Sequence, residues 1–285
     1  MDGPTHFSIR KETPMTQTIP YWHVDAFSAK PFGGNQAAVM VLDEWLPDDQ
    51  LVAIGAENLF AETAFVVRDT TGAADWELRW CTPTYEIALC GHATMASGHV
   101  LLTRDGGDRV TFRTRKSGIL EVRRSDAGYE VGLPAIPTSP RAYPEAEALL
   151  GATPLSTYRS GEEHIGYSVF EFADEAAVRG LTPDIRGLEK LGTDQFICTA
   201  PGDTTDIVSR VFVPGGGVDE DSVTGSAHSV LTPYWAAKLK RNTISAYQAS
   251  ERGGELALTL EQSDSGDRAW LGGPCVTVVE GTFTL

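Results

Sequence analysis

The chain has 285 residues, and 41% of them are hydrophobic, which is enough for a large buried core in one domain or two. Its 39 acidic and 23 basic residues give a formal net charge of -16, which argues against nucleic acid or an anionic membrane surface as the main partner. No stretch approaches about 18 consecutive apolar residues, and the N-terminus lacks the apolar segment of a signal peptide, so we expect a cytoplasmic protein.

The cysteines and histidines show no metal-binding spacing. The six histidines include no HxH or HExxH pattern, and the chain has neither a Walker loop nor a dinucleotide-binding glycine motif. We therefore expect no metal and no nucleotide cofactor. The four cysteines are widely separated, which favours reduced thiols over a disulfide framework: Cys81, Cys90, Cys198 and Cys275.

The N-terminal part of the chain predicts a leader followed by a hairpin. Residues 1–18 are polar, so we expect them to be flexible, and Met15 is an alternative natural start to Met1. Residues 21–27 and 37–42 are rich in strand formers and are separated by a glycine-rich turn. Asn35, at the end of this turn, either has an ordinary structural role or lines a pocket.

Glu62 lies where a helix gives way to a strand. A short helix is expected over 47–56, because Asp48 and Asp49 lie in its first turn. The strand that begins at Glu62 is apolar. A carboxylate with apolar neighbours loses hydration, which raises its pKa and suits it to act as general acid and base near neutral pH. The alternative is a solvent-facing glutamate at a strand edge.

Residues 91–102 predict a buried helix, because apolar and small side chains cover several of its faces. A helix start leaves backbone N–H groups without partners and carries about half a positive charge. Gly91 and His92 would therefore offer a site for a carboxylate or a phosphate. The alternative is an ordinary buried helix with a simple cap.

A similar segment lies in the second half of the chain. The acidic residues 219–221 lead through Gly225 and His228 into an apolar run that reaches Leu239. Pro233 interrupts this run and predicts a kink or a restarted helix. Two glycine-opened helices in two halves of one chain suggest two related domains, each built round a central helix.

The remaining elements are expected to be mainly strands. We place a domain boundary at the proline-rich segment 134–140. Alternation and turn residues predict strands at 76–80, 109–115, 118–124, 129–133, 168–172, 195–199, 245–249, 255–260 and 270–279, with helices at 142–150 and 174–180.

In the segments around Asn35, Glu62, His92 and Ser226, the chain resembles the PhzF family of phenazine-biosynthesis-type isomerases, which shares the diaminopimelate epimerase fold. The matching segments occur in order between residues 21 and 285, and an ordered set of this kind is hard to obtain by chance. They are 24–27 with Gly34 and Asn35, 62–65, 90–94, 220–228 and 271–273.

The resemblance implies an α+β fold of two similar domains, each a mixed, mostly antiparallel β-barrel around one central helix. The active site then lies in the cleft between them. On this basis residues 19–134 plus 272–285 form the first domain and residues 135–271 the second. The family is usually dimeric, so a homodimer is expected.

The resemblance also implies the reaction. The family's isomerase moves a proton across an allylic system in a small cyclic carboxylated substrate, without cofactor, as in trans-2,3-dihydro-3-hydroxyanthranilate isomerase of antibiotic biosynthesis. Carried over by position, Glu62 is the base and then the acid, and the other catalytic residues are His92, Asp221 and Ser226. The substrate-binding positions are Asn35, Gly91, Ala93, Gly225 and Ala227.

The chain departs from diaminopimelate epimerase, which resembles it in fold and uses two cysteines on opposite faces of the substrate. Cys90 matches the first, but the second position matches Thr224, whose hydroxyl is too weak an acid. Racemisation is therefore disfavoured. Two alternatives stay open, namely double-bond migration in another scaffold, such as an unsaturated proline precursor, and a non-catalytic member that only binds a small molecule.

Overall fold

The computed structural model describes residues 17–162, 165–264 and 266–285. Its strands join one continuous hydrogen-bonded sheet. The N-terminal strands are β1 (Thr18–Ala26), β2 (Asn35–Val41), β3 (Glu62–Arg68), β4 (Trp76–Cys81), β5 (Glu86–Ile87), β6 (Arg109–Thr114), β7 (Ile119–Ser125) and β8 (Gly128–Pro134).

The later strands repeat this arrangement. They are β9 (Ser139–Pro140), β10 (Ser156–Glu162), β11 (Ile165–Glu171), β12 (Gln195–Pro201), β13 (Ile207–Val213), β14 (Val218–Asp221), β15 (Thr243–Gln248), β16 (Gly254–Glu261), β17 (Arg268–Gly273) and β18 (Cys275–Thr284). The helices are α1 (Asp48–Asn58), α2 (Gly91–Asp105), α3 (Pro144–Glu147), α4 (Glu175–Arg179), α5 (Ile185–Glu189) and α6 (Gly225–Leu239), with a 3-10 turn η1 (Pro214–Gly216).

The strand pairings form two copies of one pattern. From β1 through β2, β3, β4, β6 and β7 to β8, successive neighbours pair antiparallel, parallel, antiparallel, parallel, antiparallel and antiparallel. From β10 through β11, β12, β13, β15 and β16 to β17 the same sequence of pairings recurs. We call β1–β8 with α2 the first repeat and β10–β17 with α6 the second repeat.

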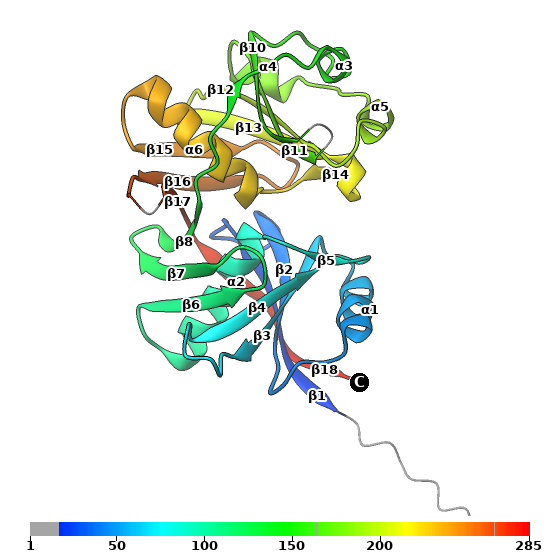
Figure 1. Cartoon of the computed structure of the whole chain (residues 1–285), viewed down its shortest axis with the longest axis vertical. Coiled ribbons are helices and arrows are strands. Elements are labelled where there is room, and N and C mark those ends of the chain that lie inside the picture. The colour runs from blue at the N-terminus through cyan, green and yellow to red at the C-terminus, as the bar shows by residue number, and fades with distance from the viewer. Residues whose placement is uncertain (1–16, 163–164, 265) are drawn as a thin grey trace, which may run out of the picture.

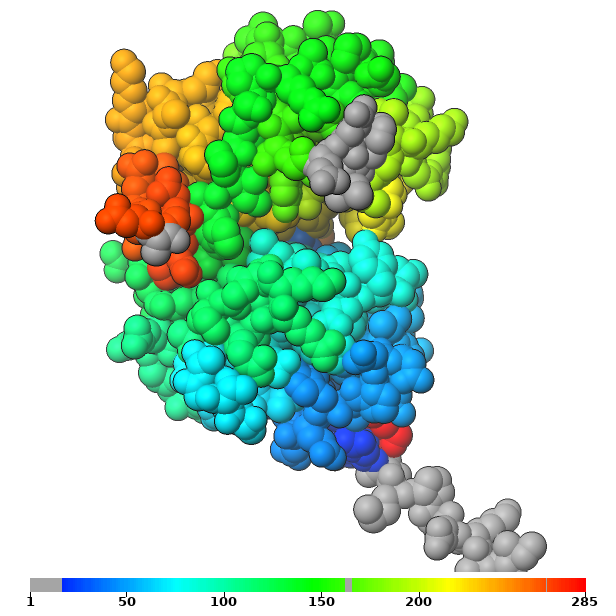
Figure 2. Space-filling model, viewed as in Figure 1, coloured from blue at the N-terminus to red at the C-terminus, as the bar shows by residue number. Residues whose placement is uncertain are grey.

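The two repeats are joined where their last strands meet. β8 pairs antiparallel with β17, from Pro134 opposite Arg268 to Tyr129 opposite Gly273. Figure 1 shows the second repeat above and the first repeat below, with β18 returning past the first repeat to lie beside β1. In Figure 2 the surface is hollowed between the yellow part of the second repeat and the cyan part of the first.

Each repeat holds one long buried helix. In α2 the residues from Gly91 to Gly98 are all buried, and α6 is buried from Gly225 to Thr232. Small side chains allow this close packing, since a Cβ atom on Gly98 would lie 2.3 Å from Val122. Both helices contribute to one hydrophobic core cluster, so the two repeats share a core.

The expected hairpin, the helix near residue 50 and the strands on either side of α2 are confirmed. The predicted restart at Pro233 is wrong, because α6 continues through this residue. Val230 and Trp235, on either side of the proline, are buried in the same core, and this packing holds the helix together without the missing N–H group.

Other expectations need correction. The predicted helix 142–150 is only the short α3, and β10 was not anticipated. The predicted strand 270–279 is divided into β17 and β18 at Pro274, which has no N–H group to pair. In the segment 134–140, Ala135 N–H donates to the carbonyl of Asp267 and Ile136 N–H to that of Ser229, and the domain boundary placed there remains a prediction.

The expected N-terminal leader lies largely outside the described residues. Thr18, which it included, is already the first residue of β1. Among the described residues, no helix combines the length and apolar character that crossing a membrane requires.

Candidate active site

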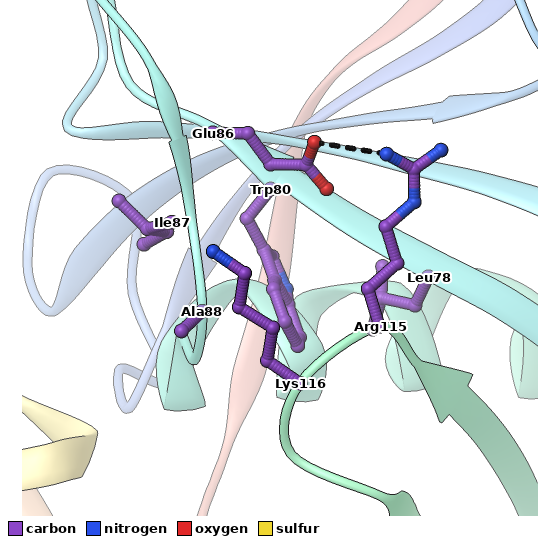
Figure 3. A pocket seen from close by; sticks show the side chains of 7 residues that line it. All are labelled: Leu78, Trp80, Glu86, Ile87, Ala88, Arg115 and Lys116. Carbon is purple, nitrogen blue, oxygen red and sulfur yellow. Dashed lines mark hydrogen bonds and ion pairs between the residues drawn. The ribbon is translucent and has the colours of Figure 1, made fainter.

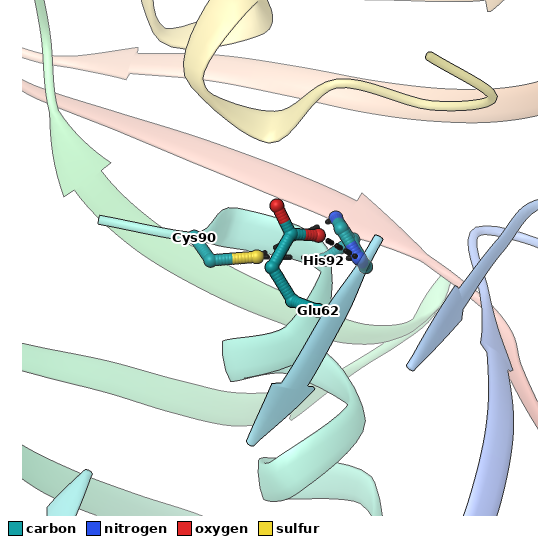
Figure 4. A group of neighbouring side chains, drawn as sticks. All are labelled: Glu62, Cys90 and His92. Carbon is teal, nitrogen blue, oxygen red and sulfur yellow. Dashed lines mark hydrogen bonds and ion pairs between the residues drawn. The ribbon is translucent and has the colours of Figure 1, made fainter. Parts of the chain in front are cut away.

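Glu62 is the first residue of β3, where it pairs with Ala37 of β2. Its side chain is 16% exposed, and its Oε2 atom lies 3.1 Å from Nε2 of His92 (Figure 4). This distance is that of an ion pair. Within the described part of the chain, however, no hydrogen bond of good geometry reaches Oε2. The carboxylate is thus held close to an imidazole while this oxygen keeps its capacity to accept a proton.

His92 is the second residue of α2 and is buried. Burial by itself lowers the pKa of His92, but the adjoining Cys90 and Glu62 side chains raise it, and the pKa lies well above 6.5. Burial raises the pKa of the Cys90 thiol to about 11, so this thiol is neutral near pH 7. We therefore assign the raised pKa of His92 to the Glu62 carboxylate, which favours an imidazolium beside it.

Asn35 connects His92 to the second repeat. Its Nδ2 atom donates to Oδ1 of Asp221 at 2.7 Å and to the carbonyl of Val223 at 2.9 Å, and it lies 3.2 Å from Nδ1 of His92. An amide nitrogen carries two hydrogens, and the two shorter contacts take both. The amide therefore fixes Asp221 across a separation of 186 residues and leaves Nδ1 of His92 free to keep its own proton.

Asp221 is the last residue of β14. Burial raises the pKa of its carboxyl above 3.8 and the Glu62 carboxylate adds to this, while His92, Thr224 and Asn35 oppose the shift. Two carboxyl groups and one imidazole thus share a small volume at the junction of the repeats. The Glu62 carboxylate raises the pKa of both other groups, and His92 lowers that of Asp221, so the charges in this volume influence one another.

The starts of α2 and α6 touch each other. A Cβ atom on Gly91 would lie 2.9 Å from Cα of Gly225, so only glycine permits this approach. The first hydrogen bonds inside the two helices are those from Thr94 N–H to Cys90 and from His228 N–H to Thr224. The N–H groups before them have no carbonyl partner within their own helix, and because the two helix starts adjoin, this region favours an anion.

The remaining predicted site residues fall into two groups. Ala93 and Ala227 are fully buried and can offer only their backbone N–H groups. Ser226 is 8% exposed and does not belong to the Glu62 cluster by direct contact. Its hydroxyl accepts from Nε2 of Gln195 at 2.9 Å and lies 3.1 Å from Oε1 of the same side chain, and it also hydrogen-bonds Tyr167.

Gln195 was not anticipated as a site residue. Sequence reasoning placed a strand start there and gave the side chain no role. The available signal was weak, because a glutamine at the start of an apolar strand is common. Its position beside Ser226 follows only from the pairing of β11 with β12, which sets Gln195 opposite Tyr167.

Cys90 precedes α2 as Thr224 precedes α6, which agrees with the correspondence expected from the sequence. A helix start by itself would lower the pKa of a thiol. Burial and the neighbouring Glu62 instead raise its pKa to about 11, against the weaker opposing effects of His92 and the Ala93 N–H group. Cys90 is therefore a poor thiolate nucleophile or base.

Three side chains of this cluster could hold a metal ion. The ligand atoms of Glu62, Cys90 and His92 lie within 4.8 Å of one another. Carboxylate, thiolate and imidazole are the usual ligands of zinc, although binding would require the buried Cys90 thiol to lose its proton. The expectation that the protein uses no metal remains a prediction.

Two cavities have linings that do not include Glu62. One, of about 10 Å³, has room for about one water molecule and is bordered by Trp80, Glu86 and Arg115 (Figure 3). The indole N–H of Trp80 is buried without a partner among the described residues. The other is a groove of about 740 Å³ beside the junction of β8 and β17, bordered by Arg123, Trp270 and others.

The comparison with known proteins identifies the family. The chain matches the family model described as phenazine biosynthesis-like protein over residues 24–281. The chain belongs to the PhzF family. An uncharacterized isomerase of Pseudomonas aeruginosa is 43% identical over 270 residues, which cover 94% of this chain and 99% of the relative. The membership predicted from the ordered motifs is therefore confirmed.

Solved structures agree with this assignment. The crystal structure of a PhzF family protein from Enterococcus faecalis is 38% identical, with a TM-score of 0.83, and the match covers 94% of this chain and 100% of that one. A hydroxyproline epimerase from Agrobacterium vitis has a TM-score of 0.60 at 11% identity, covering 94% of this chain and 93% of its own. This second likeness shows a shared fold alone.

Proposed function

We propose that this protein is a cofactor-independent isomerase that shifts a proton, and with it a double bond, in a small cyclic carboxylated substrate. The observation that carries the proposal is the partly buried Glu62 carboxylate, which lies 3.1 Å from His92 with Oε2 able to accept a proton. The relatives named as isomerases support the reaction class. Antibiotic or other secondary metabolism is the proposed setting, in the cytoplasm.

In the proposed mechanism Glu62 removes a proton from a substrate C–H bond next to the double bond. The electron pair of that bond moves into the allylic system, and negative charge spreads towards the substrate carboxylate. The His92 imidazolium and the converging helix starts stabilise this charge. Glu62 then returns the proton to another carbon on the same face, so atoms and charge balance and the carboxylate is regenerated.

One base on one face favours isomerisation over racemisation. Inversion of a stereocentre needs an acid on the opposite face, and the position that corresponds to Cys90 is Thr224, whose hydroxyl does not ionise near neutral pH. The raised pKa of Cys90 also makes this thiol an unsuitable second base.

The proposal includes the domain arrangement expected from the family. We propose two similar domains, each a mostly antiparallel barrel around α2 or α6, with the division at 19–134 plus 272–285 and at 135–271. The recurring order of strand pairings supports this division. We further propose that the protein is a homodimer and that the substrate carboxylate binds at the two helix starts, with Asn35 and the N–H groups nearby as contacts.

Deuterium incorporation tests the proposal directly. Wild type and Glu62→Gln would be incubated in deuterated water with cyclic carboxylated enamines and dienes, including an unsaturated proline precursor, and carbon-bound deuterium followed by NMR. We expect incorporation with the wild type and a loss of at least about a hundredfold in the variant, because general acid and base catalysis contributes on this scale. Glu44→Gln, at an exposed glutamate, is the matched control and should keep full activity.

Each outcome is informative about the alternatives. Retained exchange in a folded Glu62→Gln protein would contradict the role of Glu62. Exchange only with the proline-type compound would select the other scaffold. Tight binding of a carboxylated compound without any exchange by the wild type would favour a binding protein over an enzyme.

A further inference from the structure

The registers of the two repeats identify a counterpart for Glu62. In the first repeat, β2 and β3 pair in parallel from Ala37 opposite Glu62. In the second repeat, β11 and β12 pair in parallel from Tyr167 opposite Gln195. Glu62 and Gln195 are therefore the first residues of corresponding strands. Their side chains differ only in that one is an acid and the other its neutral amide.

The correspondence extends to the helix starts. His92 follows Gly91 in α2 as Ser226 follows Gly225 in α6. Glu62 contacts His92 at 3.1 Å, and Gln195 contacts Ser226 at 2.9 Å. The first residue of each strand thus contacts the second residue of the helix in its own repeat, as an ion pair in the first repeat and through a hydrogen bond in the second. Because Gly91 and Gly225 touch, the two pairs flank one junction from opposite repeats.

Buried charges hold Gln195 in place. The preceding residue, Asp194, is fully buried and forms an ion pair with Arg159 at 2.7 Å. Ser168 bonds to both partners, at 3.1 Å from Arg159 and 3.2 Å from Asp194. A paired and hydrogen-bonded buried charge resists displacement, since leaving it unpaired is unfavourable. The strand start that presents Gln195 is therefore fixed.

We propose that Gln195 is a substrate-positioning residue, which acts with Ser226 to hold a polar group of the anionic substrate on the side facing the second repeat. This inference rests on the proposed function, in that it needs an anionic substrate at the helix starts. An amide both donates and accepts, so Gln195 can exchange its bonds to Ser226 for bonds to substrate oxygen or nitrogen. A carboxylate here would repel the anion and would add a second base.

The test is anion binding by Gln195→Glu, measured by calorimetry with benzoate and with cyclohex-1-ene-1-carboxylate at about pH 8 and about pH 5.5. We expect the variant to bind at least about tenfold more weakly than wild type at the higher pH, because its introduced carboxylate faces the anion. This difference in anion affinity between the variant and wild type should be smaller at the lower pH, because partial burial lets the introduced carboxyl take up a proton there.

Two controls separate this role from a structural one. Gln50→Glu adds the same charge at an exposed position of α1 and should bind both anions as wild type does at both pH values. Gln195→Ala removes the amide without adding charge, so its weaker binding should not depend on pH more than that of wild type. A purely structural role would lower the thermal midpoint of the variants without producing the pH-dependent deficit.

Equal binding by wild type and Gln195→Glu at the higher pH would overturn the proposal. So would an identical deficit at both pH values, or a wild type that binds neither anion. The proposed isomerase activity fails on a different observation, namely no deuterium incorporation by wild type. If Gln195→Glu shows the pH-dependent loss of anion binding but wild type incorporates no deuterium, the positioning role of Gln195 is supported and the proposed isomerase reaction is contradicted.

Discussion

At the scale of single residues, the charge of His92 depends on the Glu62 carboxylate beside it. His92 is buried, and burial disfavours its charged form, yet its pKa lies well above 6.5. A folded-state pKa above the unfolded value means that His92 contributes stability that is fully present below about pH 6.5. This contribution is lost as the pH rises through the folded-state pKa.

Removal of the Glu62 charge should therefore lower the pKa of His92. In Glu62→Gln burial remains while the stabilising carboxylate is gone, so we expect the pKa to fall below that of wild type. NMR titration of the histidine ring signals measures this shift. The unfolding free energy of the variant should also change less between pH 6.5 and the wild-type pKa of His92. An unchanged titration of His92 would show that Glu62 does not set its charge.

At the scale of elements, the contact between α2 and α6 determines the shape of the anion site. A Cβ atom at Gly91 would lie 2.9 Å from Cα of Gly225, a distance that real Cβ atoms essentially never show. Backbone cannot move aside as a flexible side chain can. The helix starts must therefore separate if either glycine gains a side chain.

Gly91→Ala should destabilise the fold by about 1–3 kcal/mol, as overpacking of a core does, and should weaken anion binding because the N–H groups move apart. Denaturant titration and calorimetry with benzoate measure the two effects. Gly281→Ala is the control, because a Cβ atom there has nothing within 4 Å and its φ is not positive. Equal stability of the two variants would contradict the close contact of the helices.

At the scale of the whole molecule, the two repeats share a sheet and a core. β8 and β17 pair along their lengths, and residues of α2 and α6 belong to one hydrophobic cluster. Asn35 and Arg252 add polar connections, to Asp221 and to Asp25 respectively. A substitution that destabilises one repeat should consequently destabilise the other as well.

Arg159→Met tests this coupling, because it leaves Asp194 buried in the second repeat without its ion pair and should destabilise the protein by about 3–5 kcal/mol. Hydrogen exchange of β3 and β12 should accelerate together if the repeats unfold as one unit. Arg186→Met removes an exposed pair with Glu189 and should change stability by less than about 1 kcal/mol. Faster exchange confined to β12 would mean that the repeats unfold separately.

The sequence by itself determined the local elements and the candidate chemical groups. Alternation and turn residues located most strands, and small apolar residues located α2 and α6, because these patterns depend on neighbours in the chain. Glu62 could be selected because it opens an apolar strand, and Gly91 because it opens a buried helix. The ordered motifs then identified the family.

Only the tertiary structure decided how these groups meet. The bond between Asn35 and Asp221 joins residues 186 positions apart, and the role proposed for Gln195 depends on the register of β11 with β12. The raised pKa of Cys90 likewise depends on burial by distant segments. The physical reason is that packing and strand register are set by contacts between residues far apart in sequence, which local patterns do not encode.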